Sequence, residues 1–177
     1  MRSFLPVAVA ASALLSLASP GRAEEASADM HAVSTEGIGE SIGTVQLSDG
    51  AAGLTLAVDV QGLTPGEHGF HLHQNGSCEP AANAEGQMTP ALGAGGHYDP
   101  ESTGEHAGPE GEGHKGDLPV LEVGNDGMAM AEFTAPRLTV ADARGKALMI
   151  HAGGDNYSDQ PQPLGGGGGR VACGVVQ

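Results

Sequence analysis

The chain has 177 residues, among them 30 glycines and no tryptophan, and its formal net charge is −15. A chain this acidic is poorly suited to bind nucleic acid or an anionic membrane surface, so both are excluded as expected partners. The length is that of one domain that can bury a sizeable core.

Residues 1–23 have the layout of a secretory signal peptide. A positively charged start precedes an apolar run over 4–18, and small residues end at Ala23, where we expect cleavage. The apolar run has about 15 residues, fewer than the roughly 20 that a helix needs to span a bilayer, so no membrane anchor is expected. The first cysteine is Cys78, too far from the cut to carry a lipid. We therefore predict export to the periplasm, with the external medium as the alternative, and a single domain over 24–177.

The apolar residues of this domain occur in short alternating runs instead of at helical spacing, which predicts an all-β protein. Strands are expected over 54–60, 120–123, 128–133, 147–151 and 171–176, the second and third forming a hairpin around an Asn-Asp-Gly turn. In the first strand the even-numbered residues should face the core. Two segments rich in glycine, proline and acids, 79–115 and 155–169, are predicted to be long functional loops. The pattern favours a Greek-key barrel or sandwich of short antiparallel strands that carries these two loops.

Three histidines lie in the segment 68–73, which is also expected to be a strand. Side chains alternate across a strand, so His71 and His73 share one face, while His68 shares the other with Phe70 and Leu72. Two imidazoles on one face make half of a metal site, and surface histidines are the alternative for so short a motif. We interpret His68 as a hydrogen-bonded core histidine.

A second group of candidate ligands lies in and just after the first long loop. His97, His106, His114 and Asp117 follow one another through a stretch of mostly glycine, proline and glutamate, which has little apolar area to order its backbone. Three imidazoles and one carboxylate suit tetrahedral zinc, and a bound metal would order such a loop. A flexible loop with incidental histidines is the alternative.

The remaining candidates lie nearer the C-terminal end. His151 ends a predicted strand, where it could join the earlier histidine pair across the sheet, and imidazoles are good copper ligands. Cys78 and Cys173 are predicted to pair after export, closing about 95 residues and stabilising the fold by roughly 4–5 kcal/mol. Two free buried thiols are the alternative. The disulfide would bring Arg170, which follows a run of glycines, toward the histidines.

Five motifs occur in order along the chain: G-F-H-L-H, G-G-H-Y-D-P, H-x2-D, M-I-H-A-G-G-D and G-G-R-V-A-C-G. In order and spacing they resemble the motifs of the copper/zinc superoxide dismutases, and most closely those of the bacterial exported branch. The resemblance covers about Ile42 to Val176, essentially the whole mature chain. It implies an enzyme that converts superoxide to O2 and H2O2 at a copper site bridged to zinc, and so protects against superoxide outside the cytoplasm.

The resemblance also implies a role for each residue. The copper ligands would be His71, His73, His97 and His151, and the zinc ligands His97, His106, His114 and Asp117, with the ring of His97 between the two metals. Asp155 would accept hydrogen bonds from His71 and His106 and tie the two sites together. Arg170 would attract and orient superoxide, and His97 would deliver a proton to the peroxide. Cys78 and Cys173 match the family's disulfide.

One departure from the family concerns electrostatic steering. The segment 155–169 contains Asp155 and Asp159 but no lysine or arginine, whereas many members of the family have basic residues there. Lys115 and Arg170 are the local cations, so we predict that association with superoxide depends less on ionic strength than in family members with a basic loop.

Two other functions are compatible with histidine clusters. A non-catalytic copper-binding or copper-delivery module on the same fold typically lacks a copper histidine or the arginine, and here all are present. A zinc hydrolase needs an open metal position and a carboxylate base, whereas the histidine count fits two sites better. His31 has no counterpart among the ligands and is expected to be structural or exposed. Monomer and homodimer both stay open.

Overall fold

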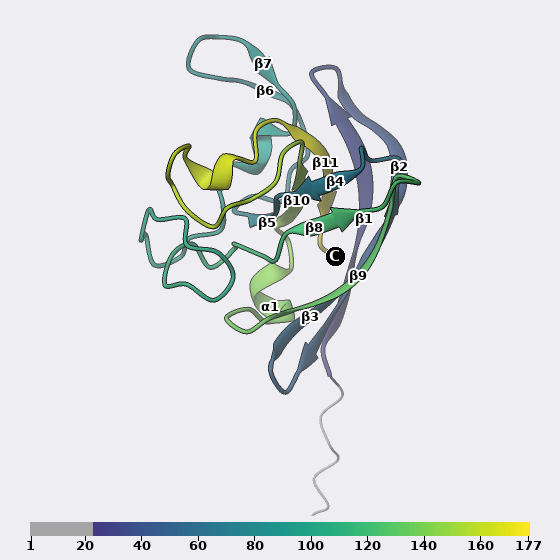
Figure 1. Ribbon diagram of the computed structural model, residues 1–177, viewed down its shortest axis with the longest axis vertical. Helices are drawn as coiled ribbons and strands as arrows, with labels where there is room; N and C mark the ends of the chain where they lie inside the picture. Colours follow the sequence, from purple (N-terminus) through teal and green to yellow (C-terminus); the bar gives the residue numbers. More distant parts are fainter. Residues whose placement is uncertain (1–22) are drawn as a thin grey trace, which may run out of the picture.

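The computed structural model describes residues 23–177, which form an all-β domain (Figure 1). Its strands are β1 (Glu25–Ser34), β2 (Gly37–Gly50), β3 (Gly53–Gln61), β4 (Gly66–His68), β5 (Phe70–His73), β6 (Ala81–Ala82), β7 (Met88–Thr89), β8 (Leu121–Val123), β9 (Met128–Ala135), β10 (Ala147–His151) and β11 (Arg170–Val175). Its helical segments are α1 (Val140–Ala143) and two short 3-10 turns, η1 (Leu92–Ala94) and η2 (Leu164–Gly166). None of the helices in this part of the chain is long and apolar enough to cross a membrane. The predicted signal peptide lies, except for its last residue, outside the described residues.

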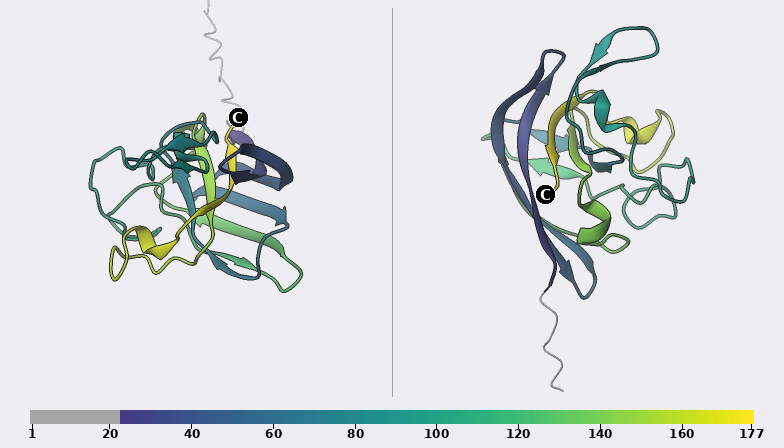
Figure 2. Two further views of the ribbon diagram at one scale, coloured as in Figure 1. Left: turned by 90° about the horizontal axis from the view of Figure 1, so that it is seen from above. Right: turned by 180° about the vertical axis from the view of Figure 1, so that it is seen from behind.

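The sheet curls into a barrel. Seven strands form one sheet in the order β5-β10-β11-β1-β2-β3-β9. The edge strand β5 is preceded by β4, the opposite edge strand β9 is preceded by β8, and β4 pairs with β8. This short ladder brings the two edges of the sheet together, and the curl is visible in Figure 2. The predicted all-β barrel of antiparallel strands is therefore confirmed.

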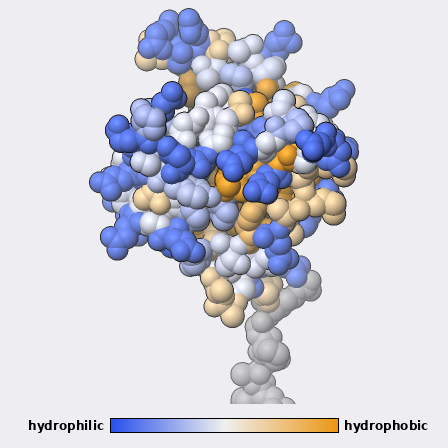
Figure 3. Space-filling view, viewed as in Figure 1, coloured by the Kyte–Doolittle hydropathy of each residue, from blue (hydrophilic) through white to orange (hydrophobic). Residues whose placement is uncertain are grey.

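Alternation along the strands determines the core. In β3 the residues Leu54, Leu56, Val58 and Val60 are each at most 4% exposed, as predicted. They belong to one cluster with Phe70 and Leu72 of β5 and Leu148 and Ile150 of β10. Burying each such side chain stabilises the folded state by about 1.5–3 kcal/mol relative to leaving it exposed to water. With these side chains inside, the face seen in Figure 3 is mainly hydrophilic.

The outer face of β5 and β10 is buried as well, because loops cover it. A second apolar cluster on this face contains Cys78 and Cys173 together with Ala91, Ala94, Ala147 and Met149. The two cysteines form the predicted disulfide across a separation of 95 residues. Met149 of β10 lies opposite His71 on one side and Cys173 on the other. The disulfide therefore fixes the start of the first loop next to the histidines of β5.

Two local predictions differ from the structure, and two long strands were not predicted. The predicted hairpin is wrong, because β8 pairs with β4 while β9 pairs with β3, so the turn between them connects two ladders. The strand predicted over 68–73 is divided at Gly69, since β4 and β5 have different partners. The strands β1 and β2 were not predicted. In β1 the buried residues include Ala26 and Ala28, whose small side chains give little hydrophobic signal.

Candidate metal centre

Main-chain hydrogen bonds carry the histidine-rich loop onto β5. Three main-chain hydrogen bonds of 2.8 Å link Leu72 of β5 to Tyr98 and to Gly116, and link Gly116 to Tyr98. As a result His97 lies opposite His73, and Asp117 lies opposite His71. The strand therefore determines where the candidate ligands of the loop lie, although the loop has few apolar residues of its own.

The first cluster contains four histidines whose ligand atoms lie within 4.8 Å of one another: His71, His73, His97 and His151. One nitrogen of each ring faces a protein oxygen: Asp155 Oδ2 for His71 (2.7 Å), Gly95 O for His73 (2.9 Å), Asp117 Oδ1 for His97 (2.9 Å) and Gly168 O for His151 (3.3 Å). The other nitrogen, Nδ1 of His71 and Nε2 of the rest, is buried without a hydrogen-bond partner. An unpaired buried polar atom costs about 1–3 kcal/mol. Four unpaired nitrogens that converge on one place fit a metal ion as their common partner.

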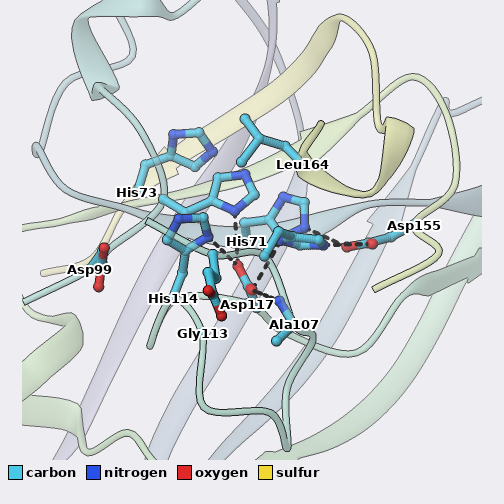
Figure 4. A network of polar contacts seen from close by, with 12 residues as sticks. His71, His73, Asp99, Ala107, Gly113, His114, Asp117, Asp155 and Leu164 are labelled. Atoms are coloured by element: carbon cyan, nitrogen blue, oxygen red, sulfur yellow. Dashed lines mark hydrogen bonds and ion pairs between the residues drawn. The ribbon is translucent and has the colours of Figure 1, made fainter. Parts of the chain in front are cut away.

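The second cluster contains His97, His106, His114 and Asp117, again within 4.8 Å of one another. The Asp117 carboxylate lies among the three rings, 2.9 Å from His97 Nδ1, 3.0 Å from His106 Nδ1 and 3.4 Å from His114 Nδ1 (Figure 4). The Nδ1 atoms of His106 and His114 are buried without hydrogen-bond partners. Three imidazole nitrogens and one carboxylate oxygen are a donor set that zinc prefers in tetrahedral sites.

Two residues join the clusters. His97 belongs to both, and Asp155 accepts hydrogen bonds from Nε2 of His71 (2.7 Å) and Nε2 of His106 (2.8 Å), as Figure 4 shows beside His71. Gly165 makes room for this carboxylate. Its φ is +69°, and a Cβ there would overlap the side chain of Asp155. Gly165, the first residue of the glycine run before Arg170, is therefore a packed part of the site.

Burial and the two carboxylates set the charges of the rings. Burial lowers the pKa of His97 to about 4 and that of His151 to about 3. It also lowers the pKa of His71 and His73, the other two histidines of the first cluster. His106 differs, because its ion-pair contact with Asp117 and its hydrogen bond to Asp155 outweigh burial and raise its pKa to about 9. Despite burial, the same contacts hold the pKa of both carboxyl groups below the ordinary range. At neutral pH the first cluster thus offers neutral imidazoles, while His106 must lose a proton to bind a metal.

Arg170 lies at the edge of the first cluster. It is opposite His151 in the pairing of β10 with β11. Its Nη1 and Nη2 donate to the main-chain oxygens of Ala91 and Gly95, both at 2.6 Å. The same Gly95 oxygen accepts the bond from Nδ1 of His73. Burial lowers the pKa of Arg170, but a guanidinium stays charged at physiological pH. The cluster therefore has a fixed positive charge beside it.

The structure brings together every residue that the sequence predicted for the site. His68 faces main-chain oxygens with both ring nitrogens, at 2.6 and 2.7 Å, as predicted for a core histidine. His31 is partly buried, with Nδ1 3.2 Å from a main-chain oxygen. Lys115 is bound to Asp142 at 3.0 Å, so it is not a free cation. The sequence did not reveal the carbonyl groups that orient the rings and Arg170, since main-chain atoms carry no residue-type signal.

The fold is an antiparallel barrel, and its two buried clusters share the imidazole of His97. Together these features are those of a β-barrel protein with a two-metal centre. The family model described as copper/zinc superoxide dismutase (SODC) matches residues 41–176. The chain belongs to the copper/zinc superoxide dismutases, a family that uses copper and zinc to dismutate superoxide.

Individual relatives agree with this assignment. The chain is 57% identical to superoxide dismutase [Cu-Zn] 2 of Salmonella typhimurium, over 84% of this chain and 86% of the relative. It is 51% identical to the superoxide dismutase [Cu-Zn] of Escherichia coli K12, over 92% and 94% of the two chains. The solved structure of Cu/Zn superoxide dismutase from Brucella abortus has a TM-score of 0.85 at 49% identity, covering 87% of this chain and all (100%) of that one.

Proposed function

We propose that His71, His73, His97 and His151 hold copper, that His97, His106, His114 and Asp117 hold zinc, and that the chain dismutates superoxide at the first of these sites. The observation that supports this most directly is the set of six buried imidazole nitrogens without hydrogen-bond partners. They fall into two groups around the shared ring of His97, one of nitrogens alone and one completed by a carboxylate. The first group suits copper and the second suits zinc.

The overall reaction converts two superoxide anions and two protons into one O2 and one H2O2. When bound, copper supplies the one-electron oxidation and reduction, and zinc supplies a second positive charge on the shared imidazole. The protein contributes orientation. The rings of His71, His73 and His151 are each held by a protein oxygen on the other nitrogen, which fixes the direction of the ligand atom.

Arg170 is proposed to attract and orient the superoxide anion. Both of its terminal nitrogens donate to carbonyl groups, so the guanidinium is held in one place beside His73 and His151. A fixed guanidinium binds a small oxyanion by charge-assisted hydrogen bonds. The charge attracts the substrate, and the fixed position determines where the substrate lies.

His97 is proposed to deliver one of the two protons. Its Nδ1 faces Asp117 in the second cluster, while its Nε2 faces the first cluster without a hydrogen-bond partner. A proton on Nε2 therefore points toward the substrate side.

The test uses the mature protein loaded with copper and zinc. We expect two metals per chain and fast dismutation, which is lost in His151→Ala and after metal removal. The matched control is His31→Ala, because His31 lies outside both clusters, and it should keep its activity. If the loaded protein binds both metals but is no more active than free copper, the catalytic assignment fails, and a copper-binding module is the function to pursue.

We also propose that the chain is exported to the periplasm and cleaved after Ala23. The composition of residues 1–23 and the disulfide, which suits an oxidising compartment, support this. Cell fractionation and N-terminal sequencing test it, and a cytoplasmic protein that keeps Met1 would refute it.

We propose a monomer, because a 55% identical relative from Salmonella enterica, with a TM-score of 0.77, is described as monomeric. Analytical ultracentrifugation tests this, and a dimer mass would refute it.

A further inference from the structure

Arg137 lies outside both clusters, and nothing in the family motifs gives it a role. It is partly buried in the segment between β9 and α1. Its Nη1 donates to the main-chain oxygen of Gly113 at 3.0 Å, and its Nη2 donates to that of His114 at 2.5 Å. Its Nε is buried without a hydrogen-bond partner, which within residues 23–177 is otherwise true only of the cluster histidines. Such a costly arrangement needs an explanation.

The two acceptors flank the α-carbon of His114. The carbonyl of Gly113 belongs to the peptide before His114, and the carbonyl of His114 belongs to the peptide after it. Peptide groups are planar, so fixing both planes fixes φ and ψ of His114 and the direction of its Cα–Cβ bond. We propose that Arg137 is a positioning residue that holds His114 in the orientation required for zinc before the metal binds. This inference rests on the proposed assignment of His114 as a zinc ligand.

The segment that carries Arg137 is fixed by contacts that involve no candidate ligand. Leu138 is buried, and its main-chain oxygen accepts a hydrogen bond of 3.0 Å from the nitrogen of Leu54 in β3. Thr139 and Asp142 form a capping box at the start of α1. Arg137 is therefore held between a core strand end and a capped helix, and its support is complete in the metal-free protein.

The loop around His114 has one other tie to the same segment, from Lys115 to Asp142 at 3.0 Å. Both of these side chains are partly exposed, and exposed ion pairs contribute little. The pair also acts one residue away from the ligand, whereas Arg137 binds the two peptides on either side of it. A planar guanidinium donates two bonds in fixed directions, which an ammonium does not. Zinc affinity should therefore depend on Arg137 much more than on Lys115.

The experiment measures zinc and copper affinities of the metal-free mature protein by competition with chelators, and the visible spectrum of Co(II) bound in the zinc site. In Arg137→Met, zinc affinity should fall about 10- to 100-fold, the usual effect of losing a group that orients a ligand. Copper affinity should stay within about threefold, because His114 is not in the first cluster. Arg137→Lys should restore part of the zinc affinity. The controls are Lys115→Met, which removes the cation next to His114 in the chain, and Arg144→Met, which removes a cation that binds Glu24 and Glu25; both should stay near the parent.

Each outcome separates the inference from the assignment on which it rests. Parental zinc affinity in Arg137→Met overturns the inference, and so does an equal loss of copper and zinc affinity, which indicates general destabilisation. If Arg137→Met does not fold, Arg137→Lys carries the test: reduced zinc affinity with parental copper affinity supports the inference, and parental zinc affinity overturns it. His114→Ala with parental zinc affinity refutes the ligand assignment itself. Loss of zinc in His114→Ala beside parental affinity in Arg137→Met refutes only the role of Arg137.

Discussion

Replacing Asp155 by asparagine is expected to weaken the binding of zinc before that of copper. The carboxylate accepts one hydrogen bond from His71 and one from His106, at 2.7 and 2.8 Å. An amide has a single acceptor oxygen, so its NH2 group opposes one of the two ring N–H groups. The two rings differ in how firmly they are held. His71 lies in β5, which is paired with β10, whereas His106 lies in a stretch without regular secondary structure. His106 is therefore the ring that moves.

The size of the effect follows from the bond that is lost. A hydrogen bond to a charged group contributes about 1.5–3 kcal/mol. At about 1.4 kcal/mol for each factor of ten, zinc affinity should fall roughly 10- to 150-fold. Copper affinity should change by less than about threefold, because the pairing of β5 with β10 keeps His71 in place.

The assay is a competition titration of zinc and copper against chelators, on the metal-free parent and on Asp155→Asn. Asp126→Asn is the matched control. It removes the same charge at the turn between β8 and β9, where Asp126 accepts a bond from the main-chain nitrogen of Met128 and belongs to neither cluster. Loss of copper before zinc, or equal losses of both, would refute the reasoning from the loop position of His106.

Three further predictions concern stability, pH and salt. Replacing Cys78 and Cys173 by serine removes a closure of 95 residues, so urea denaturation should show the free energy of unfolding reduced by about 4–5 kcal/mol; a loss below about 1 kcal/mol contradicts this. In the metal-free protein the pKa of His106 is raised from 6.5 to about 9, so its contribution to stability is complete below pH 6.5 and is lost as the pH rises through 9. Urea midpoints of the metal-free protein should fall over that window, and a rise would be inconsistent with the pairing of His106 with two carboxylates. Finally, kcat/KM should change less than about twofold between about 0.02 and 0.2 M salt, because Lys115 is held in an ion pair and Arg170 is the cation beside the first cluster; a steep fall with salt rules this out.

Local pattern was sufficient where a residue's neighbours in sequence determine its environment. The alternation of β3 predicted which of its side chains are buried, and the alternation of residues 68–73 placed His71 and His73 on the face opposite Phe70 and Leu72. The pattern failed where pairing partners matter. A turn between two short apolar runs is typical of a hairpin, yet β8 and β9 pair with different strands, because closure of the barrel requires β8 to bind β4.

The sequence by itself determined the chemistry available to this protein: the kind and order of the candidate ligands, the cysteine pair and the family. Spacing could not say what holds the ligands in place. That was decided by the tertiary structure, in which the oxygens of Gly95 and Gly168 turn the rings of His73 and His151, and Arg137 fixes the peptides around His114. Main-chain carbonyl groups are the same at every residue, so their positions emerge only when distant segments of the chain are packed together.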